Sequence, residues 1–125
     1  MNTSKYELEY TLNTAPKVLF DRLSTPSGLA EWFADDVNVV DNIYTFEWEG
    51  SQQQAELVQL KELKFIRFRW LDDPEDEFFE FKIRQDELTG DLALLISDFV
   101  SEDEKSDAID LWDSQISELK RTLGL

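Results

Sequence analysis

The residue best placed to do chemistry in this sequence is Asp98, near the end of an alternating apolar stretch. Leu92, Leu94 and Ile96 share its parity, so a regular strand would direct this carboxylate toward the buried face. An inward Asp98 would serve as the polar handle of a binding pocket, or as an acid with a raised pKa. If the strand instead frays at Ser97, Asp98 lies in solvent beside the start of a helix, where negative charge is favoured. We favour the solvent position, because sequence patterns define the ends of strands least well.

A larger set of mostly aromatic residues shares the inward parity of the expected strands or the apolar face of the expected helices. These residues could line a pocket, because binding sites are concave and rich in aromatic walls. They could also fill a solid core, which is the commoner outcome, because large aromatic side chains dominate ordinary core packing. The candidate ligand-binding residues are Trp32, Phe46, Trp48, Phe68, Trp70, Phe79, Phe81, Leu94, Ile96, Asp98, Ile109, Trp112 and Ile116.

The sequence contains no His and no Cys. The usual zinc sites, cysteine nucleophiles, serine–histidine relays and facial-triad iron sites each need one of these residues, so they are excluded. Carboxylate, Lys or Tyr chemistry remains, and a calcium or magnesium site built from carboxylates alone is conceivable. Acidic runs are usually solvated, however, and we expect no metal, no cofactor and no catalytic residue.

The chain is strongly acidic, with 28 Asp and Glu against 12 Lys and Arg and a formal charge of −16. Such a surface repels phosphate backbones and anionic lipids, so nucleic acid is not an expected partner. No stretch approaches the roughly 20 apolar residues of a membrane helix, so we expect no membrane insertion. Residues 1–5 lack the pattern of a signal peptide, which favours a cytoplasmic location.

The remaining elements are predicted from the spacing of apolar residues and from residues, such as Pro, that begin or end helices and strands. Alternation over residues 6–12 predicts a strand, and Pro16 suits the first turn of a short helix. Thr25 is suited to cap a second short helix that carries Trp32 and Phe33. Further strands are expected at 37–40, 43–48, 55–60, 65–70, 78–83 and 92–99, with Asp41 and Asn42 forming a hairpin turn.

The last part of the chain predicts one long helix over residues 101–123. Ser101 and Glu104 have the spacing of a capping box, and apolar residues then recur at helical spacing with Trp112 among them.

Arg67 and Arg69 alternate with apolar residues on an earlier strand, and cross-strand ion pairs would explain them. We therefore expect a single α+β domain over 1–125, with a curved antiparallel sheet of about six or seven strands wrapped around the long helix.

This order of elements resembles the START-like, or helix-grip (SRPBCC), superfamily. Within it, the chain is similar to homologues of the activator of the heat-shock chaperone ATPase. The resemblance is carried by Ala15 and Pro16, by Thr25 and Pro26 before Leu29, Glu31, Trp32 and Phe33, by the strand at 65–70, and by Trp112.

The resemblance implies a cavity under the long helix and two classes of function. The first is a non-catalytic binding module that holds a small apolar ligand or, as the family implies, regulates a chaperone or another protein. The second is a cyclase-like or hydrolase-like enzyme acting on a cyclic or polyketide-like substrate. We favour binding, because the inward positions are almost entirely apolar. An inward Asp98 paired with a second polar group would favour catalysis, whereas an aromatic cavity would favour binding.

Overall fold

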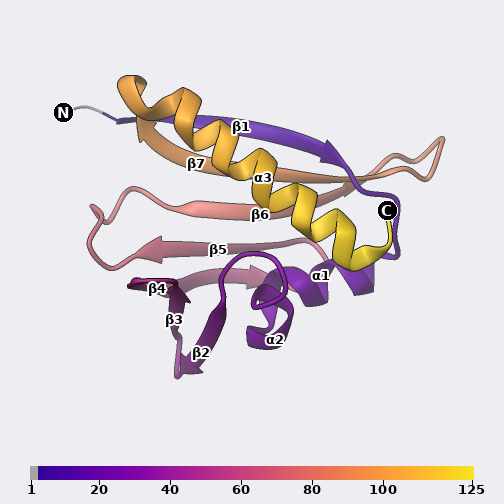
Figure 1. Ribbon diagram of the computed structural model, residues 1–125. Helices are drawn as coiled ribbons and strands as arrows, with labels where there is room; N and C mark the ends of the chain where they lie inside the picture. The colour runs from indigo at the N-terminus through magenta and orange to yellow at the C-terminus, as the bar shows by residue number, and fades with distance from the viewer. Residues whose placement is uncertain (1–2) are drawn as a thin grey trace.

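The computed structural model describes residues 3–125, and in it one helix crosses a seven-stranded antiparallel sheet (Figure 1). The expected α+β helix-grip architecture is confirmed, with two short helices after the first strand and a long helix at the end. The elements are β1 (Thr3–Thr11), α1 (Pro16–Ser24), α2 (Pro26–Leu29), β2 (Asp36–Val40), β3 (Ile43–Trp48), β4 (Ser51–Lys61), β5 (Phe65–Trp70), β6 (Phe79–Gln85), β7 (Leu92–Ser101), the 3-10 turn η1 (Glu102–Glu104) and α3 (Lys105–Leu123).

The strand order across the sheet is β1-β7-β6-β5-β4-β3-β2. Strands β2 to β7 follow one another as a meander of neighbours, whereas β1 pairs with the last strand, with Thr3 opposite Ser101 and Thr11 opposite Ala93. This pairing places β1 beside β7, and both strands lie under α3, the long helix that follows β7 in the chain. Figure 1 shows α3 running obliquely in front of β1, β7 and β6.

Two of the hairpin turns use residues that tolerate left-handed backbone. Asp41 has a φ of 57° in the β2–β3 hairpin, as the sequence predicts, and Gly50 has a φ of 79° between β3 and β4. The register between β4 and β5 shifts at Leu57 and Gln59, where β4 is bulged. A bulge reverses the parity of a strand beyond it, so Leu60, which would otherwise face away from the side of Ala55, lies opposite the buried Ile66.

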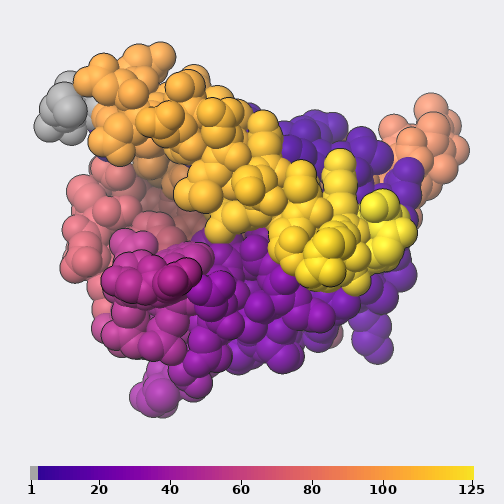
Figure 2. All heavy atoms as spheres, viewed as in Figure 1, coloured from indigo at the N-terminus to yellow at the C-terminus, as the bar shows by residue number. Residues whose placement is uncertain are grey.

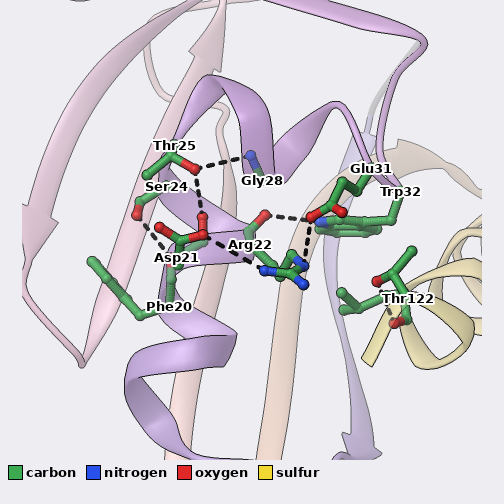
Figure 3. Close-up of polar contacts among 10 residues, drawn as sticks. Phe20, Asp21, Arg22, Ser24, Thr25, Gly28, Glu31, Trp32 and Thr122 are labelled. Carbon is green, nitrogen blue, oxygen red and sulfur yellow. Dashed lines mark hydrogen bonds and ion pairs between the residues drawn. The ribbon is translucent and has the colours of Figure 1, made fainter. Parts of the chain in front are cut away.

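The helices α1 and α2 form a tight corner that fixes Trp32 (Figure 3). The hydroxyl of Thr25 accepts from the amide of Gly28 at 2.9 Å, which confirms Thr25 as the cap of α2. Arg22 joins the corner to Glu31 by an ion pair of 2.8 Å, and its carbonyl accepts from the indole of Trp32 at 2.8 Å.

The second short helix is shorter than the sequence predicts. It ends at Leu29, and Trp32 and Phe33 lie in the turns that follow it. The amides of Trp32, Phe33 and Ala34 all donate to the carbonyl of Leu29, at 3.4, 2.8 and 3.3 Å, so the acceptor no longer advances by one residue per donor and the helix ends. Both aromatic side chains are still buried.

The start of the long helix also differs from the expectation. The 3-10 turn η1 stands between Ser101 and α3, and the hydroxyl of Ser101 makes no cap hydrogen bond. The expected capping box is therefore wrong, because the intervening turn removes the alignment that reciprocal capping needs. The other end follows a common pattern, with Gly124 at a φ of 75° and its amide donating to the carbonyls of Lys120 and Arg121.

The core under the sheet is dominated by phenylalanine. Phe46, Phe68 and Phe81 have no exposed surface, and Phe79 is 1% exposed. Their rings pack edge-to-face and stacked, with centroids 5.1 Å apart for Phe68 and Phe79 and 5.8 Å apart for Phe79 and Phe81. This part of the molecule is solid.

The outer face of the sheet carries the expected ion pairs. Arg67 contacts Glu80 on β6 at 2.8 Å, and Arg69 contacts Glu56 on β4 at 3.5 Å. Across residues 3–125, no helix is both long and apolar enough to cross a membrane.

Candidate ligand-binding site

A cavity of about 380 Å³ opens between the first half of α3 and the strands β3 to β5. Figure 2 shows the molecule hollowed below the start of α3, beside the segment that joins β3 to β4. The cavity is lined by Phe33, Trp48, Ser51, Gln53, Trp70, Asp98, Ala108, Leu111, Trp112 and Gln115. Four of these ten residues are aromatic and one is titratable.

The aromatic walls of the cavity come from four separate segments. Phe33 contributes from the turn after α2, and its ring lies 5.7 Å from that of Trp48 and 5.9 Å from that of Trp112. Trp48 and Trp70, at the ends of β3 and β5, have ring centroids 6.3 Å apart. Trp48 and Trp70 are half-buried, whereas Trp112 is 7% exposed. The aromatic wall of the cavity is therefore continuous with the buried core.

A polar cluster stands at the base of Trp112. Asp98 Oδ2 accepts from the Tyr6 hydroxyl at 2.9 Å and from the Trp112 indole at 3.1 Å. The same indole N–H also donates to the Tyr6 oxygen at 3.0 Å, and Asp98 Oδ1 accepts from the amide of Phe99 at 2.8 Å. The cluster ties β1, β7 and α3 together.

The position of Asp98 corrects the reading that the sequence favoured. The strand does not fray at Ser97, since β7 continues to Ser101 and pairs Asp98 with Tyr6. The pairing with β1 holds the strand in register, so Asp98 keeps the inward parity of Leu94 and Ile96. The solvent position was wrong, and the inward one is right.

Burial raises the pKa of the Asp98 carboxyl, because desolvation disfavours the charged form. Hydrogen bonds from Phe99, Trp112 and Tyr6 act in the opposite direction, and the charge of Asp73 adds to the rise. The pKa of the Tyr6 hydroxyl is also raised, by burial first and then by the neighbouring charge of Asp98. Tyr6 therefore remains a protonated donor at neutral pH.

A second recess of about 340 Å³ lies beside the cavity and shares Phe33, Trp48, Leu111 and Gln115 with it. The amide of Gln115 donates to the carbonyl of Phe33 at 3.0 Å, and the indole of Trp48 donates to the same oxygen at 2.8 Å. These two bonds tie α3 and β3 to the turn after α2, at the boundary between the two hollows. A larger groove of about 560 Å³ lies between α1 and the β4–β5 turn, and its lining includes the exposed Lys17, Asp21 and Glu62.

The structure brings four of the predicted site residues to the cavity: Trp48, Trp70, Asp98 and Trp112. Trp32 lines the neighbouring recess, and Ile109 is half-buried and lines neither hollow. The others are core residues, with at most 1% of their surface exposed: Phe46, Phe68, Phe79, Phe81, Leu94, Ile96 and Ile116. Ligand binding by any of these residues stays a prediction.

Sequence reasoning missed several residues of the site. Alternation marks Tyr6 only as a strand residue, whereas its partnership with Asp98 follows from the β1–β7 register. Leu111 belongs to the apolar pattern of the expected helix but is not among the candidate site residues, and Gln115 is polar, so no apolar pattern marks it. Among residues 3–125, no group of three or more potential metal-binding side chains is close enough to hold an ion.

A sequence profile of the START-like superfamily domain matches residues 1–125. The chain therefore belongs to the START-like superfamily, as the order of its elements predicts.

Three solved structures illustrate the likeness. A Bacteroides fragilis protein solved by NMR is 47% identical, with a TM-score of 0.70, covering 100% of this chain and 94% of that one. The Aha1 dimer of Colwellia psychrerythraea is 16% identical, with a TM-score of 0.79, and the match covers 94% of this chain and 93% of that one. DynU16, from the dynemicin biosynthetic locus, is 13% identical, with a TM-score of 0.81, covering 96% and 47%. No functionally curated protein matches.

Proposed function

We propose that the chain is a non-catalytic START-like binding module that holds a small, mainly apolar ligand in the cavity under the first half of α3. The observation that carries the proposal is the composition of the cavity wall. Four aromatic rings and Leu111 surround a single half-buried carboxylate, with amide and hydroxyl groups nearby. Ligand sites combine apolar walls with a few polar groups that fix orientation in this way.

The volume limits the kind of ligand. Ligand pockets usually measure about 300–1,000 Å³, so a cavity of about 380 Å³ lies at the small end of that range. The neighbouring phenylalanines are fully buried in a packed core, so the cavity cannot deepen without a rearrangement of the sheet interior. A compact ligand with one or two rings fits these dimensions.

A catalytic alternative rests on Asp98, which is inward and paired with Tyr6, as catalysis would require. The raised pKa of Asp98 would suit a general acid. Acid–base catalysis usually needs a second reactive group in the same cavity, however, and Asp98 is the one titratable residue in the described lining. The Tyr6 hydroxyl donates a hydrogen bond to Asp98, and Tyr6 is not part of that lining.

Regulation of a chaperone is the other alternative. The likeness to the Colwellia Aha1 protein, at 16% identity, concerns the fold. The cavity is formed by residues of this chain alone, so binding is the function that its geometry supports best.

The test is a titration of the ¹⁵N-labelled protein with small aromatic compounds, followed through its indole N–H resonances. Trp48, Trp70 and Trp112 line the cavity, and Trp32, hydrogen-bonded to Arg22, serves as an internal reference. We expect saturable shifts at the first three residues. Absence of shifts with every compound would contradict the proposal and direct the search to protein partners.

A pair of matched variants makes the test specific. Ala108→Met places a longer side chain on the cavity wall, whereas Ser114→Met adds the same side chain at an exposed position of α3 outside the lining. Binding should weaken at least tenfold in the first variant and persist in the second. Equal binding by both would show that the ligand lies elsewhere.

A further inference from the structure

The charge of the cavity narrows the class of ligand. We propose that the ligand carries a positively charged nitrogen, an ammonium or similar group, held between the Asp98 carboxylate and the tryptophan rings of the wall. The inference rests on the proposed function, since it specifies what the same cavity binds. No Lys or Arg belongs to the described lining, so Asp98 has no cationic side chain against it there.

The aromatic residues are the first support. Trp48, Trp70 and Trp112 all line the cavity, and tryptophan provides the strongest cation–π partner among side chains. Recognition of ammonium ligands by aromatic cages depends on several such rings around one charge. The three segments that carry them, the ends of β3 and β5 and the middle of α3, converge from different directions on one volume.

The hydrogen-bond inventory of Asp98 is the second support. An ionised carboxylate offers about four acceptor positions. Tyr6 and Trp112 take two positions on Oδ2, and the amide of Phe99 takes one on Oδ1. One position on Oδ1 remains, which suits an N–H donor from a ligand. The existing partners fix the orientation of the carboxylate without neutralising its charge.

Further negative charge lies close to the cavity. Asp73, in the acidic loop after β5, is close enough to interact electrostatically with Asp98, and Glu77 and Asp72 act on Asp73 in turn. Arg69 partly offsets this group, since it donates to the carbonyl of Asp73. The formal charge of the whole chain is −16. This field attracts cations and repels anions.

The test compares three probes that share a phenyl ring and differ in charge: phenethylammonium, 2-phenylethanol and 3-phenylpropionate. We expect phenethylammonium to bind at least about tenfold more tightly than 2-phenylethanol, with indole shifts at Trp48, Trp70 and Trp112, and 3-phenylpropionate to bind most weakly. Equal or tighter binding of the alcohol would overturn the charge inference and leave the binding module standing. Absence of binding by all three would overturn both.

Two charge variants with matched controls locate the effect. Asp98→Asn should remove the tenfold preference for phenethylammonium while 2-phenylethanol still binds, which also shows that the cavity is intact. Asp110→Asn removes the same charge from an exposed position of α3 and should keep the preference. Equal loss in both variants would mean that overall charge, and not the cavity, selects the probe.

A second variant does not depend on the buried cluster. Gln53 lines the cavity from β4 and is exposed, so Gln53→Lys adds a cation to the lining without disturbing the core. This variant should bind phenethylammonium at least tenfold more weakly and should bind 3-phenylpropionate more tightly. Gln52→Lys adds the same charge at the neighbouring position outside the lining and should change neither probe by more than about twofold. Identical behaviour of the two lysine variants would contradict the proposal.

Discussion

The two halves of α3 pack on the same sheet in different ways. The second half contributes Ile116 and Leu119, which are 1% and 0% exposed and belong to a continuous core. The first half contributes Ala108 and Leu111, which border a cavity of about 380 Å³. Trp112 lies at the boundary between the two halves, with one side of its ring buried in the core and the other facing the cavity.

The difference follows from the kinds of contact that each half makes. In the solid half, aliphatic side chains interdigitate and the helix settles until the space is filled. In the hollow half, Trp112 bonds to Tyr6 and Asp98, and Gln115 bonds to the carbonyl of Phe33, all at 3.0–3.1 Å. These bonds have preferred lengths and directions, so they hold the helix at a set distance from the sheet. The comparison shows that polar spacers can keep a cavity open beside a packed core.

The largest expected effect comes from removing the residue at the boundary. Trp112→Ala should lower the free energy of unfolding by about 3–5 kcal/mol, because it deletes a buried indole and leaves Asp98 short of a donor. Urea unfolding measures the change. Leu111→Ala, one position away and 61% exposed, is the control and should cost less than about 1 kcal/mol. A loss under 1 kcal/mol for Trp112→Ala would mean that the helix does not depend on that contact.

Removal of one polar spacer should have the next largest effect. Tyr6→Phe deletes the hydroxyl that donates to Asp98 and should cost about 1.5–3 kcal/mol, as expected for a hydrogen bond to a charged group. Tyr10→Phe deletes a similar hydroxyl that donates to Asp113 at 2.6 Å on the exposed side, and it should cost clearly less. Chemical denaturation of both variants at neutral pH would compare them. Equal losses would show that burial adds nothing to the Tyr6 contact.

Adding volume should sharpen the contrast between solid and hollow. Ala55 is fully buried on β4, so Ala55→Met overpacks the core and should cost about 1–3 kcal/mol. Ala108→Met adds the same atoms beside open space and should change stability by about 0.5 kcal/mol or less. The measurement is thermal unfolding of both variants. Similar losses would contradict the presence of room beside Ala108.

The smallest effect concerns pH. The raised pKa of Asp98 means that the folded protein keeps this proton at a pH where the unfolded chain has lost it. The stability of the natural protein relative to Asp98→Asn should therefore fall as pH rises from the ordinary Asp pKa, near 3.9, through the raised value. Tyr6 on β1 and Asp73 after β5 are the titratable groups that face Asp98. Unfolding of both proteins over that range measures the difference, and a difference that is constant or grows with pH would exclude the raised pKa.

Much of the fold could be predicted from local patterns. Alternation gave the strands, Pro16 gave the start of α1, and Trp112 marked the buried face of α3. The errors arose where backbone geometry interrupts a period: the turn η1 replaced the Ser101 cap, and α2 ended at Leu29. The residues around these two points have the composition of an uninterrupted helix, so the sequence could not predict either the turn η1 or the early end of α2.

The candidate site was less predictable than the fold. Parity indicates which side chains face inward, and Trp48, Phe68 and Trp70 all do. Parity does not indicate how far the helix stands above them, so it could not separate Phe68, which is buried in the core, from Trp48 and Trp70, which line the cavity. The register of β1 against β7 decided the position of Asp98, and that pairing joins distant parts of the chain.

The pairing of the first strand with the last also orders events during protein synthesis. Tyr6 leaves the ribosome early, but Asp98, its partner across the sheet, is translated 92 residues later. At about 5–20 residues per second, β1 waits roughly 5–20 s for its neighbour. The Asp98 side of the cavity is therefore among the last parts of the molecule to assemble, and a nascent chain that stalls before β7 has a meander without that cavity.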